Sequence, residues 1–163
     1  MYENGGPVFL MIGGEGALSP KWMIDGTWLR YARKYKALCV SVEHRFYGKS
    51  HPTEYAEFFT YLPTNLKNYS ADATFFFFRD ISTKNLAYLT SQQALADLAL
   101  FITTFSSDYG LPQGTKWITF GGSYPGSLSA WMRMKYPHLV HAAVSTSGPL
   151  LAVSDFKGIL YLK

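Results

Sequence analysis

The chain has 163 residues, of which 48% are hydrophobic and 17% aromatic, and it carries a formal net charge of +4. This composition is typical of a globular protein with one core and excludes a disordered segment. The lysines and arginines are scattered, without a basic run, so we expect a solvated surface and no nucleic-acid partner. No apolar run of about 18 residues occurs, so we expect no membrane span.

The N-terminal residues and the single cysteine bear on the cellular setting. Residues 1–6 lack the basic and apolar regions of a signal peptide, which indicates either a cytosolic protein or a missing true start. Cys39 lies in an apolar run and is expected to be a buried structural thiol. As the only cysteine, it cannot form an internal disulfide.

Residues 7–12 form a short apolar run that is typical of a strand buried on both faces. The run ends in Gly13-Gly14-Glu15-Gly16. A glycine-rich loop directly after a buried strand can present backbone amides to an anion. A flexible turn is the alternative, and only a nucleophile elsewhere in the chain favours the functional interpretation.

Residues 22–36 have the apolar spacing of a helix, and residues 37–42 are predicted to be a second buried strand. The apolar side of the helix is expected to contain Trp22, Ile24, Trp28, Leu29, Ala32 and Tyr35. After the strand, we expect Glu43 and Arg45 to hold a buried turn by a charge-assisted pair. Gly48 is expected to allow a sharp bend, and His44 is not needed for chemistry there.

Residues 54–79 show neither a strand period nor a helix period, and they include four consecutive phenylalanines. A loop of this length and composition is improbable on the surface of a compact domain. It contains the only glycosylation sequon, at Asn68, and such a short motif also arises by chance.

Regular patterns return in residues 80–110. Thr90-Ser91-Gln92-Gln93 has the spacing of a capping box, and an apolar helical face follows it. The face consists of Ala94, Leu95, Leu98, Ile102 and Phe105. Residues 140–147 are predicted to be the last strand. The alternation of strands and helices predicts a parallel sheet of about four strands with right-handed crossovers.

The most informative stretch is a β-prone run that ends in Gly121-Gly122-Ser123, with a helix-forming run directly behind it. A serine at such a turn exposes its hydroxyl, and the amide of Tyr124 points the same way from the helix N-terminus. Gly121 and Gly122, with Gly126 in the same turn, suit a strained backbone that has no room for a Cβ.

Pro125 departs from the pattern Gly-x-Ser-x-Gly, which expects a second glycine at this position. Proline loses no hydrogen bond there, because the amides of a first helical turn have no partner inside the helix. It does bias Tyr124 away from the helical region, so we expect a slightly re-aimed turn. A plain surface turn is the alternative interpretation.

Several segments in the same order together resemble one family. They are Pro7-Val8-Phe9-Leu10, Gly13-Gly14-Glu15-Gly16, Val42 to Ser50, Asn85 to Asp97, Gly121-Gly122-Ser123-Tyr124 and Lys135-Tyr136-Pro137-His138-Leu139. The chain resembles the serine carboxypeptidases that include lysosomal Pro-X carboxypeptidase, dipeptidyl peptidase II and the thymus-specific serine protease. It looks most like the thymus-specific branch.

The resemblance implies an α/β-hydrolase fold with an inserted helical cap. It also implies cleavage of peptides, often beside proline, in a lysosomal, endosomal or secreted setting. Ser123 corresponds to the nucleophile and Tyr124 to the oxyanion amide donor, with Gly14 and Glu15 in the loop that faces them. We expect peptide substrates and a homodimer by this resemblance, and neither a cofactor nor a metal.

The acid and the histidine of a catalytic triad are not in the expected order. In this fold they follow the serine as Asp or Glu and then His, and only 40 residues follow Ser123. These contain His138, His141 and Asp155, in the reverse order, and we expect none of them to be catalytic. The family pattern therefore predicts missing material before Met1, a missing cap and missing C-terminal strands.

The family pattern also predicts no counterpart for residues 54–79 in this partial domain of residues 1–163. We interpret the insert as a translated retained intron, because phenylalanine codons are pyrimidine-rich, as a 3′ splice site is. A mature transcript that contains these codons would contradict the interpretation, and sequencing the transcript decides.

Three functional hypotheses remain. The first is a serine exopeptidase, similar to dipeptidyl peptidases or Pro-X carboxypeptidases, that acts through an acyl-enzyme. The second is a catalytically incomplete remnant that acts at most as a binding module. The third is an esterase or lipase, because the fold alone does not determine the acyl substrate.

Overall fold

The computed structural model describes residues 2–52, 83–151 and 153. In these residues four parallel strands form one sheet in the order β2-β1-β3-β4. The strands are β1 (Val8–Ile12), β2 (Leu38–Val42), β3 (Trp117–Gly122) and β4 (Val140–Thr146). The predicted parallel sheet is confirmed, and the insert at residues 54–79, including Asn68, lies outside the described residues, as does Asp155.

The position of each strand in the sheet explains its burial. Leu10 of β1 pairs with Val40 of β2 on one side and with Thr119 of β3 on the other, so both sides of β1 are covered. The prediction of a buried second strand is wrong, because every residue of β2 is partly exposed at the edge of the described sheet. Cys39 in β2 is therefore a free, half-buried thiol, and burial raises its pKa.

Two long helices cover one face of the sheet. The helix α3 (Ser91–Asp108) buries the five apolar residues predicted from its spacing, and α4 (Tyr124–Lys135) buries Leu128 and Met132 in the same cluster. A buried polar pair joins α4 to β3, since the Ser129 hydroxyl donates to Thr119 Oγ1 at 2.9 Å. Neither polar group is left unpaired in the core.

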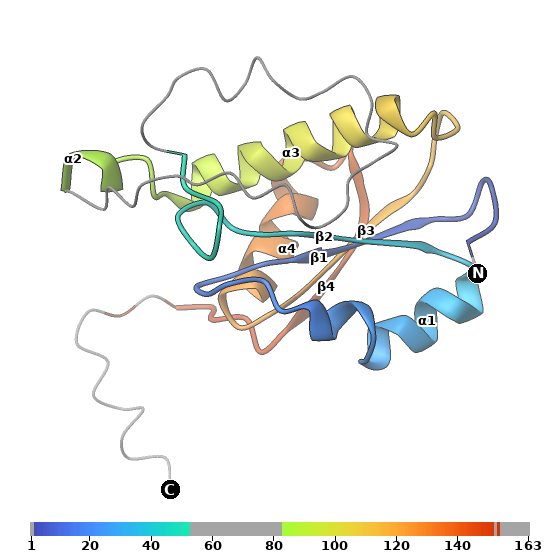
Figure 1. The fold of residues 1–163 in the computed structure, drawn as a ribbon, viewed down its shortest axis with the longest axis horizontal. Helices are drawn as coiled ribbons and strands as arrows, with labels where there is room; N and C mark the ends of the chain where they lie inside the picture. Colours follow the sequence, from blue (N-terminus) through green and yellow to red (C-terminus); the bar gives the residue numbers. More distant parts are fainter. Residues whose placement is uncertain (1, 53–82, 152, 154–163) are drawn as a thin grey trace, which may run out of the picture.

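The opposite face of the sheet is covered by α1 (Thr27–Tyr35), as Figure 1 shows by comparison with α3. Trp28 and Ala32 of α1 pack there against Phe9 and Phe120. The prediction of one helix over residues 22–36 is wrong. A 3-10 turn, η1 (Pro20–Met23), precedes α1, and Gly26 separates the two with a φ of +127°.

The break at Gly26 also changes which side chains are buried. Trp22 and Ile24 lie before it and are exposed, because they do not continue the face of α1. Tyr35, the last residue of α1, is exposed as well. The indole of Trp28 donates to the carbonyl oxygen of Trp22 at 2.7 Å, which ties η1 to α1.

The loop after β2 is held by two separate polar clusters, and the predicted pair of Glu43 with Arg45 is wrong. The Glu43 carboxylate accepts hydrogen bonds from the amides of Leu18 and Lys49 and from the Ser50 hydroxyl, each at 2.8 Å. A Cβ on Gly48 would overlap this carboxylate, and Gly48 has a φ of +58° at the predicted bend.

Arg45 instead binds α3. Its guanidinium donates to both carboxylate oxygens of Asp97, at 2.6 and 2.5 Å, and also to the Tyr88 carbonyl and the Gln93 side chain. The two planar groups match in geometry, which makes this a strong pair. Only half of the predicted capping box forms. The Thr90 hydroxyl accepts from the Gln93 amide, whereas the Gln93 side chain accepts from Arg45 and does not bind the Thr90 amide.

None of the helices in the described residues is long and apolar enough to cross a membrane.

We expect Asp97→Ala to lower the free energy of unfolding by about 2 kcal/mol, because a mostly buried Arg45 loses two charge-assisted hydrogen bonds. Asp108→Ala on the same helix removes an exposed carboxylate and serves as the control. Urea unfolding followed by circular dichroism measures both. Equal stability of the two variants would show that the pair of Arg45 with Asp97 does not stabilise the fold.

Candidate active site

Ser123 alone connects β3 to α4. The strand ends at Gly122 and the helix begins at Tyr124, so the whole reversal of chain direction falls on this residue. Ser123 has a φ of +61° and a ψ of −134°, which is an unfavourable conformation for a residue with a Cβ. The residue is exposed, at the carboxyl end of a central strand. The predicted strand, turn and helix are present.

Backbone hydrogen bonds hold Ser123 in this conformation. Its amide donates to the Thr146 carbonyl at the end of β4 at 3.0 Å. Its carbonyl accepts from the amides of Gly126, at 2.8 Å, and Ser127, at 3.3 Å. These three hydrogen bonds keep Ser123 in its strained backbone conformation, because strain persists only where the surrounding structure holds it.

The glycines around the turn are required to different degrees. A Cβ on Gly121 would overlap the Pro125 carbonyl oxygen, and a Cβ on Gly126 would lie 2.9 Å from the Thr146 carbonyl oxygen. Gly122 differs, because its Cβ would meet only that same oxygen, at 3.8 Å. The expectation that Gly122 has no room for a Cβ is wrong, since that contact is at an ordinary van der Waals distance.

Pro125 does not displace the start of the helix. Tyr124 is the first residue of α4 despite the proline that follows it, so the bias from Pro125 does not remove Tyr124 from the helix. As the first helical residue, Tyr124 has an amide with no acceptor inside the helix. A helix N-terminus also carries partial positive charge. The turn therefore combines an exposed hydroxyl with an amide suited to negative charge.

The glycine-rich loop after β1 packs directly against this turn. A Cβ on Gly14 would overlap Cγ of the Pro125 ring, so the loop approaches the start of α4 as closely as a glycine allows. The loop is tied to β2 by the Gly13 amide, which donates to the Val42 carbonyl at 2.8 Å. Gly14 and Glu15 thus lie on the same side of the sheet edge as Ser123 and Tyr124.

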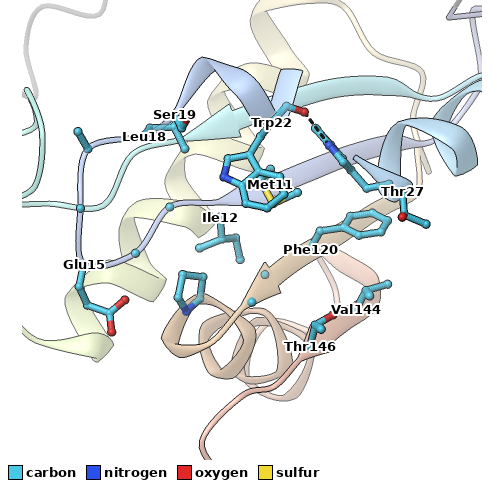
Figure 2. Close-up of a pocket in the computed structure, with 18 of the residues that line it drawn as sticks. Met11, Ile12, Glu15, Leu18, Ser19, Trp22, Thr27, Phe120, Val144 and Thr146 are labelled. Atoms are coloured by element: carbon cyan, nitrogen blue, oxygen red, sulfur yellow. Dashed lines mark hydrogen bonds between the residues drawn. The ribbon is translucent and has the colours of Figure 1, made fainter. Parts of the chain in front are cut away.

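A cavity of about 730 Å³ opens beside the turn. Figure 2 shows Met11, Trp22 and Phe120 around it, with Glu15 toward one end and Thr146 toward the other. Gly122 and Pro125 also line it, whereas Ser123 does not. Cavities at the carboxyl ends of parallel strands are the usual ligand sites of such sheets.

Tyr124 makes a contact that no sequence pattern predicts. His44, in the loop after β2, lies with its Nε2 atom 3.1 Å from the Tyr124 hydroxyl and its Nδ1 atom 2.8 Å from the Arg45 carbonyl. His44 is 6% exposed, and burial lowers its pKa. Burial also raises the pKa of Tyr124. The two residues are 80 positions apart, so no local motif indicates the pair.

Within the described parts of the chain, no hydrogen bond joins the other three histidines to Ser123. His138 follows α4, whose 12 residues rise about 18 Å away from the turn. His141 is the second residue of β4, about 17 Å along the strand from Thr146. His51 is bonded to the Gly48 carbonyl. In the described residues, no three His, Cys, Asp or Glu side chains could hold a metal ion.

Comparison with known proteins gives relatives over nearly the whole chain. A Caenorhabditis elegans protein designated as a serine protease, K12H4.7, is 42% identical over 98% of this chain and 27% of its own length. The mouse thymus-specific serine protease is 41% identical over 92% of this chain and 25% of its own. Mouse lysosomal Pro-X carboxypeptidase is 36% identical over 91% and 26%. The chain thus spans about a quarter of the length of the curated relatives it matches.

One solved structure resembles the fold. A thioesterase domain from the curacin biosynthetic pathway has a TM-score of 0.58 and 15% sequence identity, over 99% of this chain and 43% of its own. At this identity the likeness concerns the fold alone, which is that of the α/β-hydrolases.

The sequence profile of serine carboxypeptidase S28 matches residues 1–77 and 76–162, two segments that meet inside the atypical range 54–79. Almost the whole chain is therefore covered by one family. The chain belongs to the serine carboxypeptidase S28 family of serine peptidases.

Proposed function

We propose that Ser123 is the nucleophile of a serine exopeptidase that hydrolyses peptides through an acyl-enzyme. The observation that carries the proposal is the strained, exposed Ser123 at the start of α4, with the Gly14 loop packed against the same turn. A strained residue held at the end of a central strand is a common feature of functional sites. Membership of a serine peptidase family gives the class of reaction.

The proposed reaction proceeds in two stages. The Ser123 hydroxyl attacks the scissile carbonyl while a histidine takes its proton, and the carbonyl oxygen becomes an anion. The amides of Tyr124 and of the loop at Gly14 and Glu15 stabilise that anion. The histidine then gives that proton to the departing amine as the intermediate collapses to an ester on Ser123, and water hydrolyses the ester to release the acid and restore the hydroxyl.

We propose that the histidine and its acid lie in parts of the whole protein other than this chain. In the described residues, His138 and His141 lie at the far ends of α4 and β4, and His44 is engaged through both ring nitrogens. The curated relatives are about four times as long as the matching segment, which leaves ample sequence for both groups.

For the substrate, we propose peptides with proline beside the cleaved bond. The support is the name of one relative, lysosomal Pro-X carboxypeptidase. By the same resemblance we propose a lysosomal, endosomal or extracellular setting and a homodimer. Either terminus of the peptide is compatible with the proposed chemistry.

A second candidate is a non-catalytic binding module. The observation that favours it is the distance of His138 and His141 from Ser123 in the described residues. Without a base, the serine hydroxyl remains protonated and is a weak nucleophile. The two candidates therefore differ in the reactivity of Ser123.

We expect a fluorophosphonate to label the natural protein that carries this sequence, and Ser123→Ala to abolish the labelling, because the reagent reacts only with an activated serine. Ser107→Ala, at an exposed position of α3, is the control and should be labelled normally. Mass spectrometry of the labelled peptide identifies the site. An unlabelled natural protein would overturn the peptidase proposal and favour the binding module.

We expect Gly14→Ala to slow the labelling about tenfold or more, because the new Cβ displaces the loop from Pro125 and with it an oxyanion donor. Gly16→Ala makes the same change in the same loop where no atom lies within 4 Å of the new Cβ, so its rate should change little. The rate of phosphonylation measures both. Equal rates would argue against a donor in this loop.

We expect kcat/KM to be higher for peptides with a proline beside the cleaved bond than for matched alanine peptides or simple esters. The reason is that a proline-binding subsite adds transition-state binding energy only for the first group. Release of the amine or alcohol measures the rates. A preference for simple esters would instead support an esterase.

A further inference from the structure

We propose that His44 and Tyr124 form a positioning pair, in which their side-chain hydrogen bond fixes the direction of the Tyr124 backbone amide beside Ser123. The inference rests on the proposed function, because it concerns the amide that stabilises the oxyanion. It assigns a role to His44, which takes no part in proton transfer in the proposed reaction.

The helix holds the Tyr124 amide only through the carbonyl of its own peptide group. A residue before a proline is disfavoured in the helical region, and Pro125 follows Tyr124 directly. Neighbouring backbone groups are tied down, since the Ser123 amide bonds to Thr146 and the Gly126 amide to Ser123. The amide of a first helical residue has no such partner in the helix. The Ser123 carbonyl, which lies in the same peptide plane as the Tyr124 amide, accepts from the Gly126 and Ser127 amides. The side chain of Tyr124 adds a second anchor, on the other side of that plane.

That side chain is anchored on another element. The Tyr124 hydroxyl lies 3.1 Å from Nε2 of His44, and the two rings are 5.4 Å apart at an angle of 58°. The bond joins the first residue of α4 to the loop after β2. Both ends of the tyrosine are thus constrained, the backbone by the turn and the ring by His44.

The anchor itself is fixed. His44 Nδ1 lies 2.8 Å from the Arg45 carbonyl, which can only accept, so Nδ1 carries the proton in the neutral ring. Nε2 is then an acceptor, and the Tyr124 hydroxyl donates to it. Arg45 is held in turn by Asp97 of α3. Arg45 therefore connects α3 to His44, since its guanidinium binds Asp97 and its backbone carbonyl binds His44, and His44 binds Tyr124.

The surrounding charges are compatible with this direction of donation. Burial lowers the pKa of His44 and Arg45 lowers it further, while the Arg45 carbonyl, Asp97 and Glu15 oppose the shift, and the net pKa is lowered. The pKa of Tyr124 is raised by burial, Glu15 and Tyr47. Both partners therefore stay neutral near pH 7, as a hydroxyl donor and a ring nitrogen acceptor must.

The first test is Tyr124→Phe in the natural protein, with the rate of phosphonylation of Ser123 by a fluorophosphonate as the readout. Loss of one hydrogen bond predicts a rate about 3- to 10-fold lower. Tyr136→Phe deletes the same hydroxyl group at the opposite end of α4 and should react at the natural rate. Thermal unfolding of each variant verifies that it is folded.

The second test separates positioning from a structural role. His44→Gln keeps an acceptor near the place of Nε2, whereas His44→Leu removes it. We expect the glutamine variant to retain most of the rate and the leucine variant to lose as much as Tyr124→Phe. In protein labelled with 15N-tyrosine, the Tyr124 amide proton should move downfield on phosphonylation in the natural protein and the glutamine variant, and less in the leucine variant.

The outcomes of these tests distinguish failure of the proposed function from failure of the positioning pair. An unlabelled natural protein overturns the proposed function and this inference together. A labelled natural protein with equal rates for Tyr124→Phe and Tyr136→Phe overturns this inference alone. If Tyr124→Phe does not fold, the His44 variants decide, and equal rates or equal amide shifts for glutamine and leucine overturn it.

Discussion

The site depends on how closely the first turn of α4 approaches the end of β3. Gly121 and Pro125 touch backbone to backbone, with no space for a Cβ between them. Because the helix starts this near the strand, one residue must reverse the chain, and Ser123 does so at a φ of +61°. Ser123 is exposed at this strand–helix corner, and its amide is held there by the Thr146 carbonyl.

Several polar groups anchor the loops at this edge of the sheet. Glu43 binds backbone amides from two loops, and Arg45 joins the loop after β2 to Asp97 of α3. Loops at the carboxyl ends of strands need such anchors if their atoms are to keep a fixed geometry. The backbone carbonyl of Arg45 binds His44, so one residue contacts both α3 and the histidine that lies against Tyr124.

Local patterns predicted much of this structure, and distant contacts account for what they missed. The apolar face of α3, the strand β1 and the turn at Ser123 follow from the spacing of neighbouring residues, and all three are present. The helix predicted over residues 22–36 failed at Gly26, because apolar periodicity does not record a positive φ. The pair of Arg45 with Asp97 joins residues 52 positions apart, and a pattern of neighbouring residues cannot indicate such a contact.

In the proposed function, binding of negative charge and transfer of a proton come from different parts of the fold. Ser123, Tyr124 and Gly14 lie at the ends of two adjacent strands, β3 and β1, and their geometry is set by contacts within this chain. Proton transfer needs a histidine at hydrogen-bond distance from Ser123, and His138 and His141 lie at the far end of the sheet. Absence of the base leaves the anion-binding geometry unchanged. The peptidase and the binding module therefore share one shape and differ only in proton transfer.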